Sequence, residues 1–330
     1  MPLHTGHIKL IEFGAKQVDT LIVLVAYKRD EPIDGQLRYA RVKEQFKEHK
    51  NISVHILDCT DMADSKEADR EVSREWAGYL NTTFPEVKIL FSSEAYGDYV
   101  AEYGKLTHIL YDEPRTTTPI SATMIRNDPV AYRDYIPKHI QPYFVKKVCI
   151  VGTESTGKST ITKRLAEYFA TSYVTEAGRD LVPDTFACTM EDLNGVAEEH
   201  ARRIKTLKEE ANKILFMDTD LTITRSYGRF LFYRDLKVAP WVEAENKADL
   251  YLYMDKDCPL VQDGGRLEEE GRTALDISHQ KTLADSNITV HHLNGTRQEK
   301  FQKALQLIST HIGKTAVSQT LLLSFIFLVI

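Results

Sequence analysis

The sequence predicts an α/β protein made of two doubly wound domains, each with a parallel sheet covered by helices. Three observations lead to this prediction. Short apolar runs alternate with amphipathic segments along most of the 330 residues, as in repeated β-α units. A glycine-rich phosphate-binding motif stands near the middle of the chain, at residues 152–159. A chain of this length exceeds one ordinary core, so we expect a separate domain before the motif.

The first half of the chain alternates helical and extended segments. Ile8, Ile11 and Ala15 share one face of a predicted helix over residues 4–17. Further amphipathic helices are predicted over residues 36–48, 67–84 and 98–104. Apolar runs between them predict strands at Thr20–Ala26, Asn51–Asp58, 87–93 and 107–112.

A join between the halves is predicted around Tyr143–Val145. Pro137, Pro142 and the basic pair Lys146–Lys147 stand there, between the last helix of one half and the first strand of the next. We therefore expect domains at 1–143 and 144–313, followed by an apolar tail at 314–330. In the second domain, strands are predicted at Val148–Val151, 213–220, Asp249–Asp255 and 288–295, and helices at Ser159–Ala170, Glu191–Lys213 and 297–310.

Composition narrows the class of protein. A net charge of −6 and a pI near 6.0 argue against a general nucleic-acid binder, which would normally carry a basic face. The four cysteines are scattered and form no C-x-x-C pair, which fits a reducing cytoplasm and argues against a zinc site or a disulfide frame. The first ten residues lack a basic region followed by an apolar run, so no secretory signal is predicted there. We expect a cytoplasmic enzyme acting on small molecules, and the oligomeric state is left open.

The last ten residues, Leu321–Ile330, are apolar except for Ser324. This run is short for a spanning helix, which needs about 20 apolar residues. Membrane contact, docking on a partner and a terminus altered by a reading-frame change all fit such a tail, and the sequence does not choose among them.

The central motif fits the phosphate-loop pattern G-x-x-x-x-G-K-[ST] at Gly152, Gly157, Lys158 and Ser159. Its glycines let backbone amides point at phosphate oxygens, its lysine reaches the outer phosphates, and its hydroxyl can hold Mg²⁺. An apolar strand leads into the motif and a helix leads out, which is the required context. The residues predicted to bind ATP are Gly152, Thr153, Glu154, Ser155, Thr156, Gly157, Lys158, Ser159 and Thr160.

Phosphoryl transfer also needs carboxylates and a further positive charge. Asp218 and Asp220 follow the apolar run Ile214–Met217, so one could complete the Mg²⁺ shell while the other accepts a proton from the substrate hydroxyl. The pattern does not assign these two roles, and a solvated acid is the alternative for either residue. Arg266 and Arg272 lie on a glycine- and acid-rich segment that we interpret as a lid over the γ-phosphate. A solvated surface loop is the alternative there.

A second pair of segments predicts an anion site in the first domain. His4 and His7 flank Gly6 directly before a helix, where two imidazoles and a helix N-terminus suit a phosphate. Alone, this motif would fit a metal pair or surface histidines nearly as well. The segment 119–126 strengthens it, because Ser121 and Thr123 open another helix and Arg126 lies one turn in.

Together these motifs resemble a known family. "HTGH" with "ISATMIR" looks like the HxGH nucleotidyltransferases, which have a Rossmann-like fold. Their combination with "SSEAYGDYVAEY", "YIPKHIQPYFVKKV" and "GTESTGKST" is similar to the bifunctional NadR-type proteins, over nearly all of residues 1–312. That resemblance implies adenylyl transfer from ATP to nicotinamide mononucleotide in the first domain, giving NAD and pyrophosphate. It implies 5′-phosphorylation of nicotinamide riboside by a P-loop kinase in the second.

The resemblance also implies site residues. His4, His7, Ser121 and Arg126 would contact ATP in the first site, while the phosphate loop and Asp218 would serve the second. Trp241 becomes a candidate for stacking on the nicotinamide ring, with an ordinary packing role as the alternative. Adenylyl transfer proceeds by in-line attack on the α-phosphorus, so positioning and charge neutralisation suffice and no nucleophilic Ser or Cys is needed.

The sequence departs from the family pattern at its start. In the family a strand and a glycine-containing turn precede the first histidine, whereas here only Met1, Pro2 and Leu3 do. The first strand of a doubly wound sheet is central, so its absence predicts unpaired edges on both neighbouring strands. On this basis we expect weak or absent adenylyl transfer beside an intact kinase.

Two other classes of protein stay open. One is a single-function P-loop nucleoside kinase with a degenerate front domain, and the other is a regulator that senses nucleotides without useful turnover. A GTPase is disfavoured, because Asn246–Asp249 fits the letters of a guanine motif but precedes a strand instead of following one.

Overall fold

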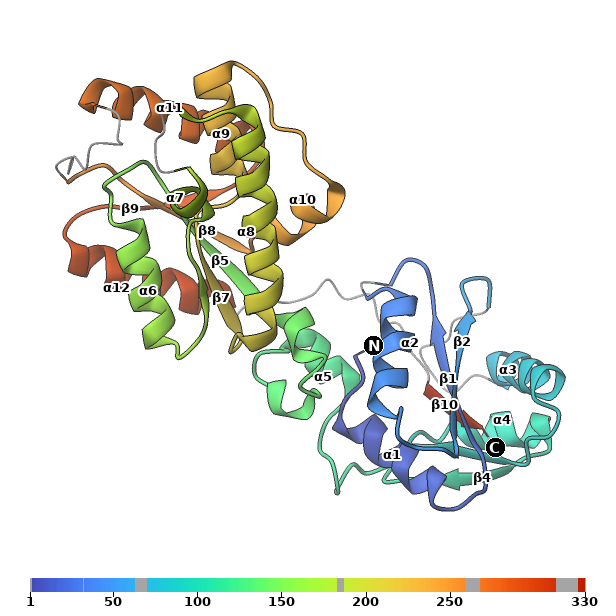
Figure 1. Ribbon diagram of the computed structural model, residues 1–330. Helices are drawn as coiled ribbons and strands as arrows, with labels where there is room; N and C mark the ends of the chain where they lie inside the picture. The colour runs from blue at the N-terminus through green and yellow to red at the C-terminus, as the bar shows by residue number, and fades with distance from the viewer. Residues whose placement is uncertain are drawn as a thin grey trace. The chain divides into compact units, whose positions relative to one another are not determined.

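The computed structural model describes residues 2–31, 33–62, 70–182, 187–258, 268–312 and 326–329. The chain divides into two compact units, Met1–Ile140 with Thr315–Ile330 and Gln141–Lys314. Each unit holds a five-stranded sheet with helices packed on it (Figure 1), which confirms the predicted α/β class; the strands are parallel except for the last strand of the chain. The division lies between Ile140 and Gln141, and it groups the C-terminal segment with the first unit.

The first unit begins with a helix and ends with the last strand of the chain. Its helices are α1 (Thr5–Ala15), α2 (Gly35–Gln45), α3 (Arg70–Thr83), α4 (Gly97–Gly104) and α5 (Ala122–Asn127), with a 3-10 turn η1 (Arg133–Tyr135). Its strands are β1 (Leu21–Tyr27), β2 (Ile52–Asp58), β3 (Ile89–Ser92), β4 (Thr107–Leu110) and β10 (Ile326–Val329). The predicted strands at Thr20–Ala26 and Asn51–Asp58 are confirmed within one residue.

The strand β10 occupies the centre of the first sheet. The strand order is β2-β1-β10-β3-β4, with β1 parallel to β2 and β3 parallel to β4. The inserted strand runs antiparallel to both neighbours: Leu328 is opposite Val23 of β1 and Phe91 of β3. The expectation that β1 and β3 would have unpaired facing edges is therefore wrong. A short apolar run at the far end of the chain pairs with both.

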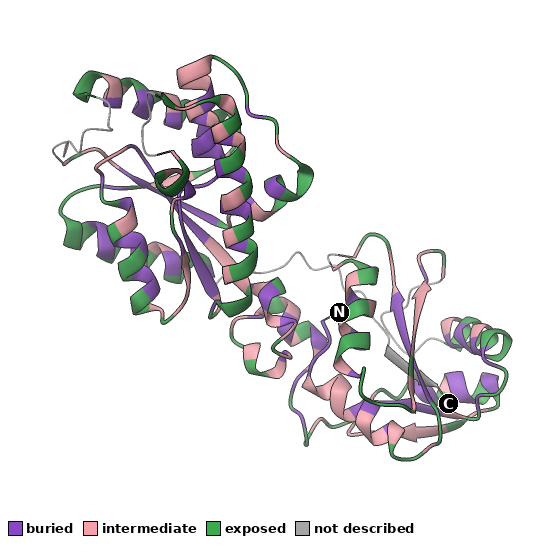
Figure 2. Cartoon of the chain, viewed as in Figure 1, coloured by how far each residue is buried: buried purple, intermediate pink, exposed green. Residues whose placement is uncertain are grey.

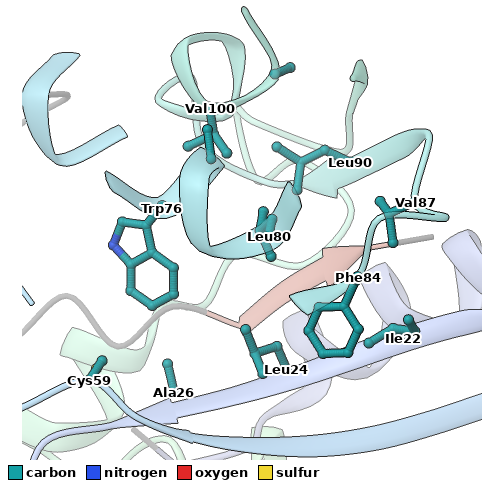
Figure 3. Packing of buried hydrophobic residues seen from close by; sticks show 12 residues of the cluster. Ile22, Leu24, Ala26, Cys59, Trp76, Leu80, Phe84, Val87, Leu90 and Val100 are labelled. Carbon is teal, nitrogen blue, oxygen red and sulfur yellow. The ribbon is translucent and has the colours of Figure 1, made fainter. Parts of the chain in front are cut away.

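Helices cover the first sheet from both sides. One face of β1, carrying Leu24, packs with Trp76 and Leu80 of α3 and with Val100 of α4, and the ribbon of β10 passes beside this cluster (Figure 3). On α1, Gly14 lies against the sheet, since a Cβ placed there would be 3.4 Å from side-chain atoms of both Leu21 and Phe91. Helices on both faces are the doubly wound arrangement.

The second unit has an all-parallel sheet. Its strands are β5 (Lys146–Val151), β6 (Tyr173–Val174), β7 (Ile214–Asp218), β8 (Leu250–Met254) and β9 (Val290–Leu293), in the order β6-β7-β5-β8-β9. Its helices are a 3-10 turn η2 (Gln141–Phe144), α6 (Lys158–Tyr168), α7 (Ala177–Leu181), α8 (Met190–Glu210), α9 (Leu221–Phe232), α10 (Pro240–Asn246), α11 (Glu269–Asp285) and α12 (Arg297–Ile312). The predicted helices at Ser159–Ala170 and Glu191–Lys213 correspond to α6 and α8.

The central strands of this sheet are buried on both faces (Figure 2). This burial fits their sequences, because β8 and the residues Ile214–Met217 of β7 do not alternate apolar with charged residues. Ile204 of α8 and Leu283 of α11 pack in one cluster with Leu215 of β7. On α6, the ring of Tyr168 packs edge-on against Phe301 of α12, with 5.9 Å between centroids.

No helix in the described ranges is both long enough and apolar enough to cross a membrane. In the apolar tail, residues Ile326–Val329 form the strand β10, while Leu321–Phe325 of the predicted run lie outside the described residues.

Candidate functional site

The phosphate loop leaves the centre of the second sheet in a conformation that requires glycine. Gly152 directly follows β5 with φ of +136°, and a Cβ there would lie 2.7 Å from the backbone oxygen of Met254. Gly157 has φ of +87° and comes directly before α6. Both values lie in the region that residues with side chains avoid. The motif glycines therefore let the chain turn tightly at both ends of the loop.

The lysine of the loop is folded back onto the loop itself. Lys158 Nζ donates to the carbonyl oxygen of Thr153 at 2.9 Å, and Thr156 Oγ1 donates to the same oxygen at 2.8 Å. The side chain of Lys158 is buried, while Thr160, two residues further, is exposed. An ammonium group held by a carbonyl oxygen of the loop is placed to neutralise phosphate oxygens.

Two oxygen atoms beside the loop fit a hard cation. Ile150 of β5 pairs with Asp218 of β7, so the carboxylate lies next to the start of the loop. Asp218 Oδ1 and Ser159 Oγ are both buried, and within the described parts of the chain neither has a partner at good hydrogen-bond geometry, although the Ser159 hydroxyl lies close enough to Asp218 to act on its pKa. No cluster of three or more His, Cys, Asp or Glu side chains suited to a metal occurs among the described residues. One hydroxyl and one carboxylate suit Mg²⁺, because this ion is usually bound by few protein oxygens and takes its other ligands from phosphate and water.

Burial raises the pKa of Asp218, and the negative charge of Glu176 raises it further. Lys158 and the nearby Ser159 hydroxyl act in the opposite direction. Glu176 comes two residues after the strand β6, and it forms an ion pair with Arg179 at 2.9 Å. Two carboxylates (Asp218 and Glu176) and two cations (Lys158 and Arg179) therefore lie near the carboxyl ends of β6 and β7, beside the phosphate loop.

Asp220 has a different position. Its carboxylate is the N-cap of α9, and it accepts bonds from the backbone N–H groups of Thr222 (2.9 Å) and Ile223 (3.2 Å). The hydroxyls of Thr222 and Tyr251 donate to its other oxygen, each at 3.0 Å. Burial raises its pKa and these four hydrogen bonds oppose that rise. A carboxylate with so many partners has little capacity left for substrate, so we assign Asp220 to the helix cap.

This difference gives a prediction for the two aspartates. Asp220→Ala should lower the free energy of unfolding of the second unit by about 1–3 kcal/mol, because it removes a cap and leaves buried donors unpaired. Asp218→Asn should leave stability within about 1 kcal/mol, since the amide keeps the shape of the carboxylate and removes a charge whose burial is unfavourable. Two measurements on both variants separate the role of helix cap from that of site acid: the free energy of unfolding in denaturant and the rate of phosphoryl transfer. A catalytic loss larger in Asp220→Ala than in Asp218→Asn would contradict the assignment.

The predicted lid arginine is turned into the protein. Arg272 of α11 is 1% exposed, and its Nε donates to the carbonyl oxygen of Glu154 at 3.1 Å. Its Nη2 is buried without a hydrogen-bond partner in the described residues. Arg266 lies outside the described residues. Glu154 also accepts from the hydroxyl of Tyr227 at 3.3 Å, so the loop is held by side chains of both α9 and α11.

Trp241 lies near the start of α10, after Pro240, and is 42% exposed. An indole of this exposure is not a core side chain. Its ring presents apolar surface that a flat ligand can cover.

In the first unit, His4 and His7 meet at the start of α1. Their rings are stacked with centroids 3.7 Å apart. His4 is the N-cap and its Nδ1 accepts from the N–H of Gly6 at 3.1 Å. A Cβ on Gly6 would lie 2.9 Å from the His4 ring, so the glycine allows the approach of the imidazole. His4 is buried, which excludes the interpretation as surface histidines.

The electrostatic environment keeps both imidazoles neutral. Burial lowers the pKa of His4 to about 3, and Arg115 and Arg126 add to that effect. Burial lowers the pKa of His7 well below its usual value, and the neighbouring His4 adds to that effect. Arg115 was not predicted from the sequence. Its Nη2 bonds Glu94 at 2.6 Å. Two neutral imidazoles beside the guanidinium groups of Arg115 and Arg126 are suited to bind an anion that accepts hydrogen bonds.

The remaining predicted residues of this site lie on α5. Ser121 caps the helix by accepting from the N–H of Met124 at 3.1 Å. Thr123 Oγ1 accepts from Arg126 Nη2 at 2.9 Å. Burial lowers the pKa of Arg126, and Glu31 opposes that shift. The charge of Arg126 acts on the pKa of both histidines, so Arg126 belongs to this site. The Ser121 hydroxyl is already used as the helix cap.

The histidine pair predicts a pH dependence of stability. An unfolded histidine takes up a proton near pH 6.5, but His4 in the folded state does so only near pH 3. The unfolded state therefore gains protons as the pH falls through this window, and the first unit loses stability, by at most about 1.4 kcal/mol per pH unit for each histidine. His4→Asn keeps a capping acceptor and does not titrate. Between pH 7 and pH 5 it should lose about 1–2 kcal/mol less than the wild type. Thermal unfolding at both pH values measures this difference, with the exposed His49→Asn as control; equal losses in all three proteins would contradict it.

Fold and site together define a two-domain α/β nucleotide-binding protein whose second domain carries the phosphate loop of P-loop proteins. The family model described as an AAA domain matches residues 147–300. The chain is 30% identical to the trifunctional NAD biosynthesis/regulator protein NadR of Salmonella typhimurium, over 95% of this chain and 82% of that protein. It is 31% identical to the protein of the same name from Escherichia coli, over 80% of this chain and 69% of that one. The chain belongs to the NadR family.

Solved structures agree on the fold. A NadR protein crystallised in complex with NAD and AMP-PNP superposes with a TM-score of 0.75, at 21% identity, covering 97% of this chain and 95% of that one. A NadR protein crystallised with NR gives a TM-score of 0.76, with the same identity and coverage. The two-domain α/β arrangement predicted from the sequence is therefore that of NadR structures.

Proposed function

We propose that this chain phosphorylates nicotinamide riboside with ATP in its second unit and transfers AMP from ATP to nicotinamide mononucleotide in its first. The carrying observation is the phosphate loop with its buried Lys158 next to Asp218. Membership of the NadR family, whose relatives are named for NAD biosynthesis and regulation, supports these substrates.

In the second unit the loop amides and Lys158 bind the outer phosphates of ATP. Ser159 and Asp218 would hold Mg²⁺, which supplies charge neutralisation of the phosphates when bound. Asp220 is committed to capping α9, so Glu176 is the better candidate for the second carboxylate that the reaction needs. It raises the pKa of Asp218 and thus lies close to it. With Asp218 assigned to Mg²⁺, Glu176 accepts the proton of the 5′-hydroxyl as the oxygen attacks the γ-phosphorus.

Trp241 is our candidate for recognising the base. Its exposed indole is an electron-rich face, and the nicotinamide of the riboside is a cationic ring, so stacking would gain both burial and cation–π attraction. A single-function kinase for neutral nucleosides would gain less from this residue, which favours the nicotinamide substrate.

In the first unit His4, His7 and Arg126 bind the phosphates of a second ATP. Neutral imidazoles donate N–H groups to phosphate oxygens, and the arginine carries the positive charge. Arg115 joins them, because its charge acts on both histidines. These groups position the mononucleotide phosphate for in-line attack on the α-phosphorus and stabilise the pyrophosphate that leaves.

One experiment tests both reactions. The purified chain is incubated with ATP, Mg²⁺ and nicotinamide riboside, and the products are identified by mass. Nicotinamide mononucleotide followed by NAD supports the full proposal. Mononucleotide alone supports the single-function kinase and the weak transfer expected from the sequence. Tight nucleotide binding without either product would leave the regulator as the better description and overturn the proposal.

A further inference from the structure

Three consecutive peptide carbonyls of the phosphate loop are held by side-chain donors. The oxygen of Thr153 accepts from Lys158 and Thr156, as described above. The oxygen of Glu154 accepts from Arg272 Nε at 3.1 Å. The oxygen of Ser155 accepts from the thiol of Cys258 at 3.0 Å. The last two donors come from outside the loop, from α11 and from the segment that follows β8.

Fixing a carbonyl also fixes an amide. Each peptide group is planar, and no cis peptide bond occurs in the described chain, so the N–H of the next residue points away from the carbonyl. Arg272 and Cys258 therefore fix the directions of the N–H groups of Ser155 and Thr156 respectively. Successive amides pointing to one side form the concave nest that binds phosphate. If these two peptide planes rotated, their carbonyl oxygens would face the phosphates and repel them.

The two outside donors are also linked to each other. Arg272 Nη1 donates to the carbonyl oxygen of Cys258 at 3.3 Å and contacts Glu269 at 3.2 Å. The guanidinium is 1% exposed and Cys258 is partly buried. One buried cation thus joins the loop, the segment after β8 and the start of α11.

We propose that Cys258 and Arg272 are positioning residues for the kinase reaction, which hold the phosphate loop with its amides directed at the ATP phosphates. The thiol acts as a hydrogen-bond donor, not as a nucleophile or a metal ligand. This proposal rests on the proposed nucleotide site of the second unit. It adds a residue, Cys258, that lies outside the phosphate-loop motif.

A matched set of variants tests the thiol. Cys258→Ala removes the donor, and Cys258→Ser keeps a donor of similar reach. Cys188→Ala is the control, since the Cys188 thiol also donates to a carbonyl, that of Thr189 at 3.4 Å, but at the start of α8. The affinity for AMP-PNP with Mg²⁺ is measured by titration calorimetry, and binding that is lost in Lys158→Ala is taken as binding to the second unit. Thermal unfolding without nucleotide is measured alongside.

We expect Cys258→Ala to weaken binding about fivefold, as for loss of one neutral hydrogen bond, without a change in unfolding temperature beyond that of Cys188→Ala. Cys258→Ser should stay within about twofold of the wild type. Arg272→Leu, which removes charged hydrogen bonds, should weaken binding by more than about tenfold. If Arg272→Leu does not fold, the cysteine variants decide alone.

Equal binding by Cys258→Ala and the wild type would overturn the positioning role. A loss that serine does not restore would overturn it as well, because the cause would then be side-chain volume and not the donor. Absence of any Lys158-dependent binding in the wild type would be a different failure. It would overturn the nucleotide site itself, and this proposal with it.

Discussion

Replacing Lys158 by methionine should lower the phosphorylation of nicotinamide riboside by at least about 10³-fold. Methionine keeps most of the side-chain volume but has no charge, so the developing negative charge on the transferred phosphoryl group loses its buried partner. Lys158 is 6% exposed, and a cation in such a site acts through a lower dielectric than a surface one. Initial rates with saturating ATP and riboside measure the loss.

Two controls accompany this variant. Lys163→Met changes an exposed lysine of the same helix, whose Nζ lies 3.9 Å from Glu167, and should keep phosphorylation within about twofold. Adenylyl transfer by the same Lys158→Met protein should equal that of the wild type, because it is proposed for the other unit. A loss of less than about tenfold in phosphorylation would contradict the role of the phosphate loop.

Interrupting the strand β10 should destabilise the first unit by at least about 2 kcal/mol. Leu328 is opposite Val23 on one side and Phe91 on the other, so its N–H points at a neighbouring strand whichever edge it faces. Proline at this position has no N–H and breaks the ladder in the middle of the sheet. We therefore expect Leu328→Pro to lower the unfolding midpoint of the first unit and to leave the second unchanged.

The two tryptophans of the chain allow each unit to be followed separately. Trp76 is buried in the core of the first unit and Trp241 lies on the second. In a Trp241→Phe background, fluorescence reports the unfolding of the first unit alone. Leu328→Val keeps the backbone donor and an apolar side chain with high strand propensity, and it serves as the matched control. Identical midpoints for proline and valine would show that β10 does not hold this sheet together.

The conformation of the phosphate loop was predictable because its determinants are local. Gly152, Gly157, Lys158 and Ser159 follow one another within eight positions, and the turn, the helix start and the phosphate site depend on that spacing alone. The alternation of strands and helices was predictable for the same reason, since each element carries its own periodicity.

Features that depend on distant contacts were not predictable. Nothing in the run Leu321–Ile330 indicates that four of its residues pair with strands about 300 and 240 positions earlier. Asp218 and Asp220 look equivalent in sequence. The helix start at Leu221 and the hydroxyl of Tyr251 identify Asp220 as the cap, which leaves Asp218 as the acid proposed for the site. Glu176 was missed because the strand before it has two residues, too few to show a pattern. Its position after an apolar pair, Tyr173–Val174, was the available signal.

The central position of β10 also bears on how the protein is made. A ribosome releases residues in order, and the first domain of a chain ordinarily folds before the second has been synthesised. Here the strand between β1 and β3 is supplied by residues 326–329, so that sheet is completed only after the entire second unit has been synthesised. The unit encoded first is thus finished last, and until then the facing edges of β1 and β3 carry unpaired backbone N–H and C=O groups.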